Sequence, residues 1–193
     1  HLAKLGASVT VIDGTGPASH ASRGTFAWVN ATWAKQPRNY HALNQESVAN
    51  WHDLAKALNI PFTATGSLAW FTGAARQNKL AAQIEEQALW GEPARMISGD
   101  ALSALEPHVD FMGASAAAFS GNDGAVDPVA ATHAMLAAAE KMGAVITTPC
   151  TLTGATHAAG ELRSVETSRG SIRADKLVLA TGAAPNIAKQ FAE

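Results

Sequence analysis

The stretch "HLAKLGASVTVIDGTGPASHASRGTFAW", residues 1–28, decides the fold, because it joins a helix, a strand and a loop of small residues. Leu2, Ala3 and Leu5 are spaced for a helix. The helix is expected to end at Gly6, because glycine adopts the left-handed conformation of a helix C-terminus at little steric cost. This opening therefore predicts a helix that leads directly into a strand.

The predicted strand is short and rich in β-branched residues. Val9, Val11 and Ile12 form an apolar run of the kind found in buried parallel sheets, and Asp13 closes it. In a βαβ dinucleotide-binding fold, the acidic residue after the second strand accepts hydrogen bonds from the adenosine ribose. An ordinary αβ unit with a solvated aspartate has the same pattern, so the helix, glycine, strand and aspartate alone leave both interpretations open.

The loop that follows, "GTGPASHASRGTFAWVNA" (14–31), contains Ser19, Ser22, Arg23 and Gly24. Small residues let backbone N–H groups approach a diphosphate, and arginine adds a fixed positive charge. A plain surface loop is the alternative. At this loop the sequence resembles the FAD-dependent amine and amino-acid oxidoreductases, the family of D-amino-acid oxidase, glycine oxidase and sarcosine oxidase. The resemblance implies that the four residues named here and the aspartate before them bind FAD.

Three short motifs further along the chain extend the resemblance. They are Gly-Ser-Leu at 66–68, Leu-Glu-Pro at 105–107 and Gly-Ala-Val-Asp-Pro at 124–128. The family shows "G-S-L", "L-E-P" and "G-x-V-D-P" in this order. Each motif is weak alone, and the ordered set is more specific.

The last third of the chain repeats the pattern of a nucleotide fold. Pro128 is suited to the first helical position, because its missing N–H costs nothing there. The helix is expected to run to about Met142 and to be followed by a strand at Val145–Thr147. A hairpin across Ser168–Ser171 and an apolar strand at Leu177–Ala180 are predicted next.

The resemblance adds three cofactor residues to this region. Leu152 falls where the family's main chain contacts the adenine ring, and Thr181-Gly182 forms a strand–turn that brings backbone against the cofactor in such folds. A plain β-turn leading into a helix is the alternative for the turn.

The middle of the chain predicts amphipathic helices and irregular strands. Apolar spacing indicates a helix at 40–58, and a composition rich in Ala, Gln, Glu and Leu favours another at 74–90. Within 98–107, Ser98 or Asp100 is the expected cap of a short helix that ends at Pro107. The segment 62–72 reads as a strand pair or a bent strand, and 112–128 reads as a strand, a turn and a returning strand.

Composition excludes several classes of protein. Of the 193 residues, 47 % are hydrophobic and 16 % charged, which fits a buried core and argues against disorder. The net charge is −2 without charge runs, so no nucleic-acid partner is expected. No apolar run reaches the ~20 residues of a membrane span. The single Cys150 excludes an internal disulfide and, with no signal-peptide pattern, leads us to expect a cytoplasmic protein.

We therefore predict an α/β protein with an α+β insert: a partial Rossmann-like FAD-binding fold interleaved with an antiparallel-sheet substrate domain. Residues 1–38 and 122–193 are expected to form the FAD-binding part, and 39–121 the substrate side. The resemblance places a first strand with its G-x-G-x-x-G turn before His1 and further pocket residues after Glu193. On that ground we expect the chain alone to bind FAD poorly and to be inactive.

The implied activity is oxidation of the C–N bond of an amino acid or secondary amine by hydride transfer to flavin, as in a D-amino-acid dehydrogenase or oxidase. A nicotinamide-dependent dehydrogenase and a non-catalytic nucleotide-binding module are the alternatives. The sequence singles out no catalytic residue, and its histidines lack metal-ligand spacing. Of the five tryptophans, Trp28 and Trp70 are expected nearest the cofactor loop and the substrate-side sheet.

Overall fold

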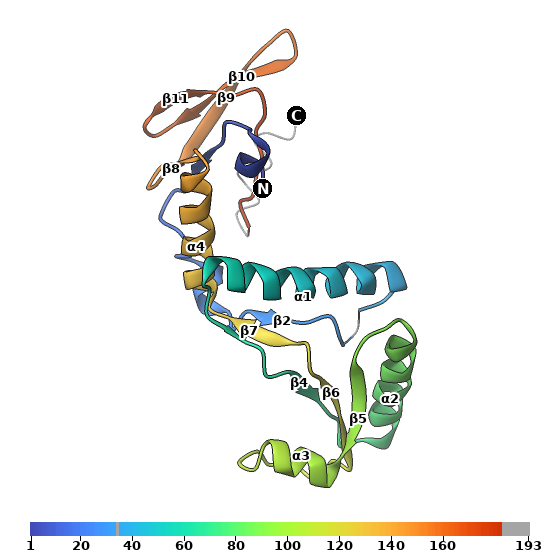
Figure 1. Ribbon diagram of the computed structural model, residues 1–193. Helices are drawn as coiled ribbons and strands as arrows, with labels where there is room; N and C mark the ends of the chain where they lie inside the picture. The colour runs from blue at the N-terminus through green and yellow to red at the C-terminus, as the bar shows by residue number, and fades with distance from the viewer. Residues whose placement is uncertain (34, 183–193) are drawn as a thin grey trace. The chain divides into compact units, whose positions relative to one another are not determined.

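The computed structural model describes residues 1–33 and 35–182, which divide into two compact units (Figure 1). The first unit comprises residues 1–19 and the chain from 136 onward, and the second comprises residues 20–135. Parallel and antiparallel sheets are both present, as the predicted mixed α/β class requires. Among the described helices, none combines the length and the apolar character needed to cross a bilayer.

The opening of the first unit follows the predicted order of elements. A 3-10 turn, η1 (Ala3–Leu5), ends at Gly6, whose φ of 84° lies in the left-handed region. Strand β1 (Thr10–Ile12) follows and pairs in parallel with β8 (Val145–Thr147). The helix, glycine and strand predicted at the start of the chain are thus confirmed, although the helix is a single 3-10 turn.

An antiparallel sheet completes the described part of the first unit. It consists of β9 (Leu152–Ala158), β10 (Glu161–Thr167) and β11 (Gly170–Arg173), in the order β11-β10-β9. The turn between β10 and β11 confirms the hairpin predicted at 168–171. The strand predicted at Leu177–Ala180 is wrong, because these residues pair with no described strand. An apolar run such as this one is compatible with a strand, but a strand forms only where a neighbour supplies hydrogen bonds.

In the second unit, a long helix packs on a small sheet. Helix α1 (Arg38–Leu58) is the helix predicted at 40–58, and it ends at Asn59 in the left-handed conformation. The sheet has the order β2-β7-β3, with β2 (Trp28–Val29), β3 (Phe62–Thr63) and β7 (Gly124–Val126) all antiparallel. The core between them buries small and β-branched side chains, among them Val29, Val48 and Val126.

The other sheet of the second unit has the order β4-β6-β5. Its strands are β4 (Ser67–Ala69), β5 (Ala94–Ser98) and β6 (Ala116–Ser120). Helix α2 (Ala74–Leu89) packs against β5, and α3 (Gly99–Leu105) contacts β5 and β6. The Ser98 hydroxyl caps α3 by accepting a hydrogen bond from the Ala101 N–H.

The strands within 62–72 and 112–128 exist, but neither pair forms a local hairpin. β3 and β4 belong to different sheets, and so do β6 and β7. The predicted return of 112–128 onto itself is therefore wrong. Gly66 and the turn at 121–123 carry the chain from one sheet to the other, and each strand pairs with a partner distant in the sequence.

Helix α4 (Pro128–Lys141) begins in the second unit and ends in the first, with Pro128 in the predicted first position. The domain boundaries predicted at 38/39 and 121/122 stay a prediction, because the two units are defined by compactness and not by function. The strand predicted after the helix has the expected bounds.

The start of α4 is held by Asp127, which gives a first test of the fold. Its Oδ1 accepts hydrogen bonds from the N–H groups of Val129 and Ala130, both at 2.9 Å. Asp127→Ala removes this cap and is expected to lower the free energy of unfolding by about 1 kcal/mol. Asp127→Asn keeps the acceptor, so its free energy of unfolding, measured by urea unfolding, should fall by less than half as much as that of Asp127→Ala. Equal losses in both variants would show that the cap contributes nothing.

Candidate functional site

Asp13 lies at the carboxyl end of β1, where its side chain organises the following turn. Oδ1 accepts hydrogen bonds from the N–H of Thr15 at 2.9 Å, from the N–H of Gly16 at 2.7 Å and from the Thr15 hydroxyl at 3.2 Å. The Asp13 N–H donates to the Thr147 carbonyl at 3.3 Å, which extends the pairing of β1 with β8. The carboxylate is thus fixed at the edge where two parallel strands end, the usual ligand-binding edge of such sheets.

Ser19 belongs to the same hydrogen-bonded loop as Asp13. Its hydroxyl lies 2.8 Å from the Thr15 hydroxyl and donates to the Gly16 carbonyl at 2.7 Å. Thr15 therefore connects the Asp13 carboxylate to the Ser19 hydroxyl. The structure brings these two predicted residues into one network on the exposed surface of the first unit.

Leu152 belongs to a segment whose backbone is hydrogen-bonded to that of Asp13. The N–H of Cys150 donates to the Asp13 carbonyl at 2.7 Å, and Leu152 opens β9 two residues later, half-buried. Thr181 is half-buried, and Gly182 is exposed with a φ of 56°. Their role at the cofactor stays a prediction.

The remaining predicted residues fall in the second unit. Ser22, Arg23 and Gly24 lie in the 3-10 helix η2 (Ala21–Gly24), and all three are exposed. The Arg23 N–H donates to the His20 carbonyl at 3.0 Å. Their proposed contact with a diphosphate also stays a prediction.

The second unit contains a pocket of about 380 Å³, and the residues just after η2 in the sequence belong to its lining. Phe26 and Trp28 lie at one side with their rings stacked, 6.3 Å between centroids. Among the described residues that line the pocket, none carries a charge. They are Phe26, Trp28, Thr63, Thr65, Gly66, Ser67, Leu68, Gly124 and Ala125.

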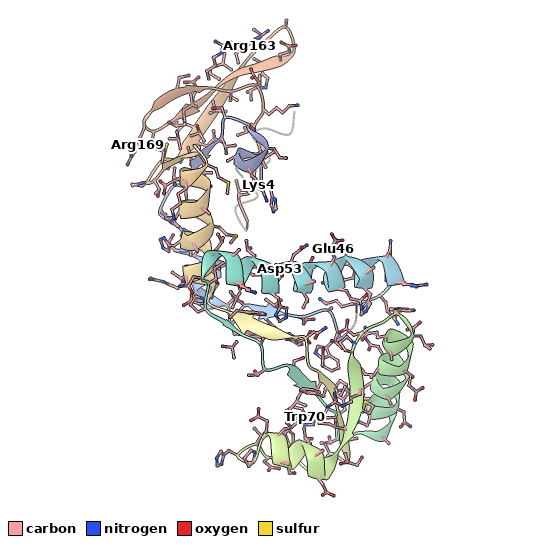
Figure 2. The ribbon with its side chains drawn as sticks, viewed as in Figure 1. Lys4, Glu46, Asp53, Trp70, Arg163 and Arg169 are labelled. Carbon is pink, nitrogen blue, oxygen red and sulfur yellow. The ribbon has the colours of Figure 1, made fainter. Side chains whose placement is uncertain are left out.

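Of the two tryptophans expected near the site, only Trp28 lines this pocket. Trp70 packs edge-on against Phe111, with 4.8 Å between ring centroids, in the core beside α3 (Figure 2). Trp70 directly follows β4 and so lies beside the sheet where it is expected, and its packing against Phe111 gives the ring a structural role there.

Asp123 is a buried carboxylate at this pocket that sequence reasoning missed. Its Oδ1 accepts from the Ala31 N–H at 3.2 Å, and its Oδ2 accepts from the hydroxyls of Thr32 at 3.3 Å and Ser67 at 2.5 Å. Burial raises the pKa of Asp123 despite these hydrogen bonds. Asp123 precedes the "G-x-V-D-P" motif and Ser67 belongs to "G-S-L", so the signal that could have located this site was the spatial meeting of two motifs.

Glu92 is a second buried carboxylate, and it interacts electrostatically with Asp123. Glu92 accepts from the Gln45 side-chain amide at 3.2 Å, and its Oε2 lies 3.5 Å from Nε2 of His41, a fully buried side chain. Burial raises the pKa of Glu92 and lowers the pKa of His41, so both shifts favour the uncharged forms. Ser120 donates to Glu92 at 3.5 Å and stands between the two carboxylates.

These shifts predict how stability depends on pH. A carboxyl group whose pKa is raised by folding stabilises the fold fully below its unfolded pKa and loses that contribution as the pH rises through its folded pKa. The free energy of unfolding of the wild type, relative to Glu92→Gln, should therefore fall as the pH rises from about 4.5 upward. Urea unfolding of both proteins from pH 4.5 to 8 measures this difference. A difference that grows with pH would contradict the raised pKa.

Other reactive side chains in the described chain do not form a further centre. Within residues 1–33 and 35–182, no group of three or more His, Cys, Asp or Glu side chains is arranged to hold a metal ion. Cys150 is buried as a free thiol.

Known proteins resemble this chain in sequence and in fold. Residues 1–192 match the family DAO, described as FAD dependent oxidoreductase. No curated protein sequence matches the chain. Among solved structures, the chain is similar to L-proline dehydrogenase from P. horikoshii, with 26 % identity and a TM-score of 0.88 over 96 % of this chain and 49 % of that one.

Two further structures share the fold at lower identity. Glycine oxidase from Bacillus cereus ATCC 14579 has 23 % identity and a TM-score of 0.85, over 95 % of this chain and 51 % of that one. L-amino acid deaminase from Proteus vulgaris has 23 % identity and a TM-score of 0.82, over 93 % and 43 %. The chain thus spans about half the length of the structures it matches. Because the family match extends over nearly its whole length, the chain belongs to the FAD-dependent oxidoreductase family.

Proposed function

We propose that the protein oxidises the C–N bond of an amino acid or a secondary amine. The family's cofactor is FAD, which supplies the hydride acceptor when bound. The observation that carries the proposal is the Asp13 carboxylate at the carboxyl edge of the parallel β1–β8 pair, in a chain whose family match is nearly complete. The names of the similar structures, a proline dehydrogenase and a glycine oxidase among them, support amino acids as the substrate class.

The donors and acceptors at this edge fit the adenosine half of FAD. A ribose presents hydroxyl donors, and a carboxylate held at a strand end is an acceptor suited to them. We assign Asp13 to the ribose, the main chain at Leu152 to the adenine, and Ser19, Ser22, Arg23 and Gly24 to the diphosphate side. Thr181 and Gly182 complete the set. These assignments rest on the family's pattern together with the Asp13–Thr15–Ser19 network.

The pocket beside Phe26 and Trp28 is the proposed place for the substrate's side chain. Its aromatic and aliphatic walls offer apolar surface to a ligand, and the hydroxyl groups of Thr63 and Thr65 offer hydrogen bonds. A charged substrate side chain would lose its hydration there without gaining an ion pair from the described walls. We therefore propose amino acids with apolar or aromatic side chains as the preferred substrates.

The test uses the full-length protein, purified and scanned for bound flavin. Amino acids with apolar, acidic and basic side chains, each as the D and the L enantiomer, and N-methylated amino acids are added without oxygen, and loss of the oxidised flavin absorbance is followed. Bleaching by an apolar amino acid is the expected result, and faster bleaching by the D enantiomer would support the finer proposal of a D-amino-acid oxidase or dehydrogenase. A colourless protein, or one that needs a nicotinamide cofactor, would overturn the proposal.

A further inference from the structure

Asp123 joins two segments of the second unit that are distant in the sequence. Its side chain is fully buried and accepts hydrogen bonds from Ala31, Thr32 and Ser67. Its backbone carbonyl accepts a further one from the Gly66 N–H at 2.9 Å. A buried carboxylate is unfavourable unless its lone pairs are satisfied, so this set of donors holds the side chain in one position.

The groups that Asp123 holds form a wall of the uncharged pocket. Gly66 and Ser67 line it, and so does Gly124, the residue that follows Asp123. The Ser67 hydroxyl also accepts a hydrogen bond from the Trp33 indole at 3.2 Å. Trp33 has a φ of 52°, a left-handed conformation that is unfavourable for a bulky residue and persists where its surroundings hold it.

We propose that Asp123 is a positioning residue for this pocket: through Ser67 and Gly66 it fixes the wall against which the substrate is placed, without touching the substrate itself. The inference rests on the proposed function only in assigning the substrate to this pocket. Asp123 itself is fully buried and does not line the pocket, so it acts through the lining residues to which it is hydrogen-bonded.

The positioning depends on the charge state of Asp123. As a carboxylate it accepts from both Ser67 and Thr32 through Oδ2, whereas a protonated Oδ2 has to donate and disrupts one of these bonds. The titratable groups that face it are Glu92, reached through Ser120 on β6, and His41 on α1 beyond Glu92. Burial raises the pKa of Asp123, so its carboxylate takes up a proton at a higher pH than an exposed aspartate does.

The experiment compares Asp123→Asn and Ser67→Ala with Ser47→Ala in the full-length protein carrying FAD. Ser47 is an exposed residue of α1 whose hydroxyl bonds only within its own helix, to the Leu43 carbonyl, so it is the matched control. Asparagine keeps an acceptor for the Ala31 N–H and the size of the side chain. Both test variants are expected to raise KM for the preferred amino acid about tenfold, with kcat changed less than about threefold and FAD content unchanged.

A pH profile separates positioning from a loss of fold. In the wild type, KM should rise as the pH falls, because Asp123 takes up a proton. In Asp123→Asn, KM should not show this rise at low pH. If KM and its pH profile are the same in Asp123→Asn as in the wild type, the inference is wrong. A fall in kcat with unchanged KM also overturns it.

A measurement without substrate decides the inference even if no amino acid reduces the flavin, the result that overturns the proposed function. Hydrogen exchange of the segments 29–33 and 65–69 should be about tenfold faster in Asp123→Asn than in the wild type. The segment 74–89 of α2 should be unchanged, as should all three segments in Ser47→Ala. Equal exchange of the two pocket segments in wild type and Asp123→Asn overturns the inference.

Discussion

Replacing Asp13 with alanine is expected to weaken FAD binding by about a hundredfold, or about 2.7 kcal/mol. Two losses add in this variant. The Thr15 and Gly16 N–H groups lose their acceptor, so the turn after β1 loosens. The ribose hydroxyls lose the carboxylate that the family pattern assigns to them, and hydrogen bonds to charged groups contribute about 1.5–3 kcal/mol each.

Asp13→Asn separates the two losses. Its side-chain oxygen still accepts from the turn, while the negative charge is gone, so FAD binding should weaken only about tenfold. Asp53→Asn makes the same chemical change at an exposed position of α1 (Figure 2) and should leave the FAD dissociation constant within about twofold. The measurement is titration of the full-length apoprotein with FAD, followed by flavin fluorescence. If all three variants bind like the wild type, Asp13 does not contact the cofactor.

The parts of the fold that the sequence predicts well are those set by neighbouring residues. Gly6 marks the end of a helix and Pro128 the start of one through local conformational preferences, and both do so in the structure. The strand at Val145–Thr147 has the predicted bounds, and all three of its residues are β-branched. Local signals of this kind need no knowledge of the rest of the chain.

What the sequence could not predict depends on partners far along the chain. Leu177–Ala180 has the composition of a strand, yet no described strand pairs with it. Asp123 sits in a run of turn-forming residues and reads as a solvated turn aspartate, whereas its donors Ala31 and Ser67 are 92 and 56 residues away. The residues of a buried polar network form no repeating pattern in the sequence, so only the three-dimensional contacts identify them.

Gly124 offers the second large effect, because there is no room for any side chain at this position. A Cβ added there would meet the backbone oxygen of Thr63 on the neighbouring strand β3 and would lie 2.9 Å from the Phe62 ring. A rotamer change can move the ring but not the strand backbone. Gly124→Ala is therefore expected to lower the free energy of unfolding by about 3 kcal/mol, the upper range for overpacking a core.

Gly154 is the matched control, a glycine within strand β9. A Cβ at Gly154 would lie 3.7 Å from the Glu166 Cβ, an ordinary contact, so Gly154→Ala should change stability by less than about 1 kcal/mol. The double variant Gly124→Ala with Phe62→Leu relieves the ring contact and leaves the clash with the Thr63 oxygen, so it should recover only a minor part of the loss. Urea unfolding followed by circular dichroism measures all four proteins.

Strain at Gly124 should also reach the pocket, because Gly124 lines it and β7 carries both β2 and β3. The Gly124→Ala protein, where it folds, should show a raised KM as well as a lowered stability, whereas Gly154→Ala should show neither. A Gly124→Ala protein with wild-type stability would mean that β3 moves aside at no cost, and the tight approach of β3 to β7 would then not constrain the pocket.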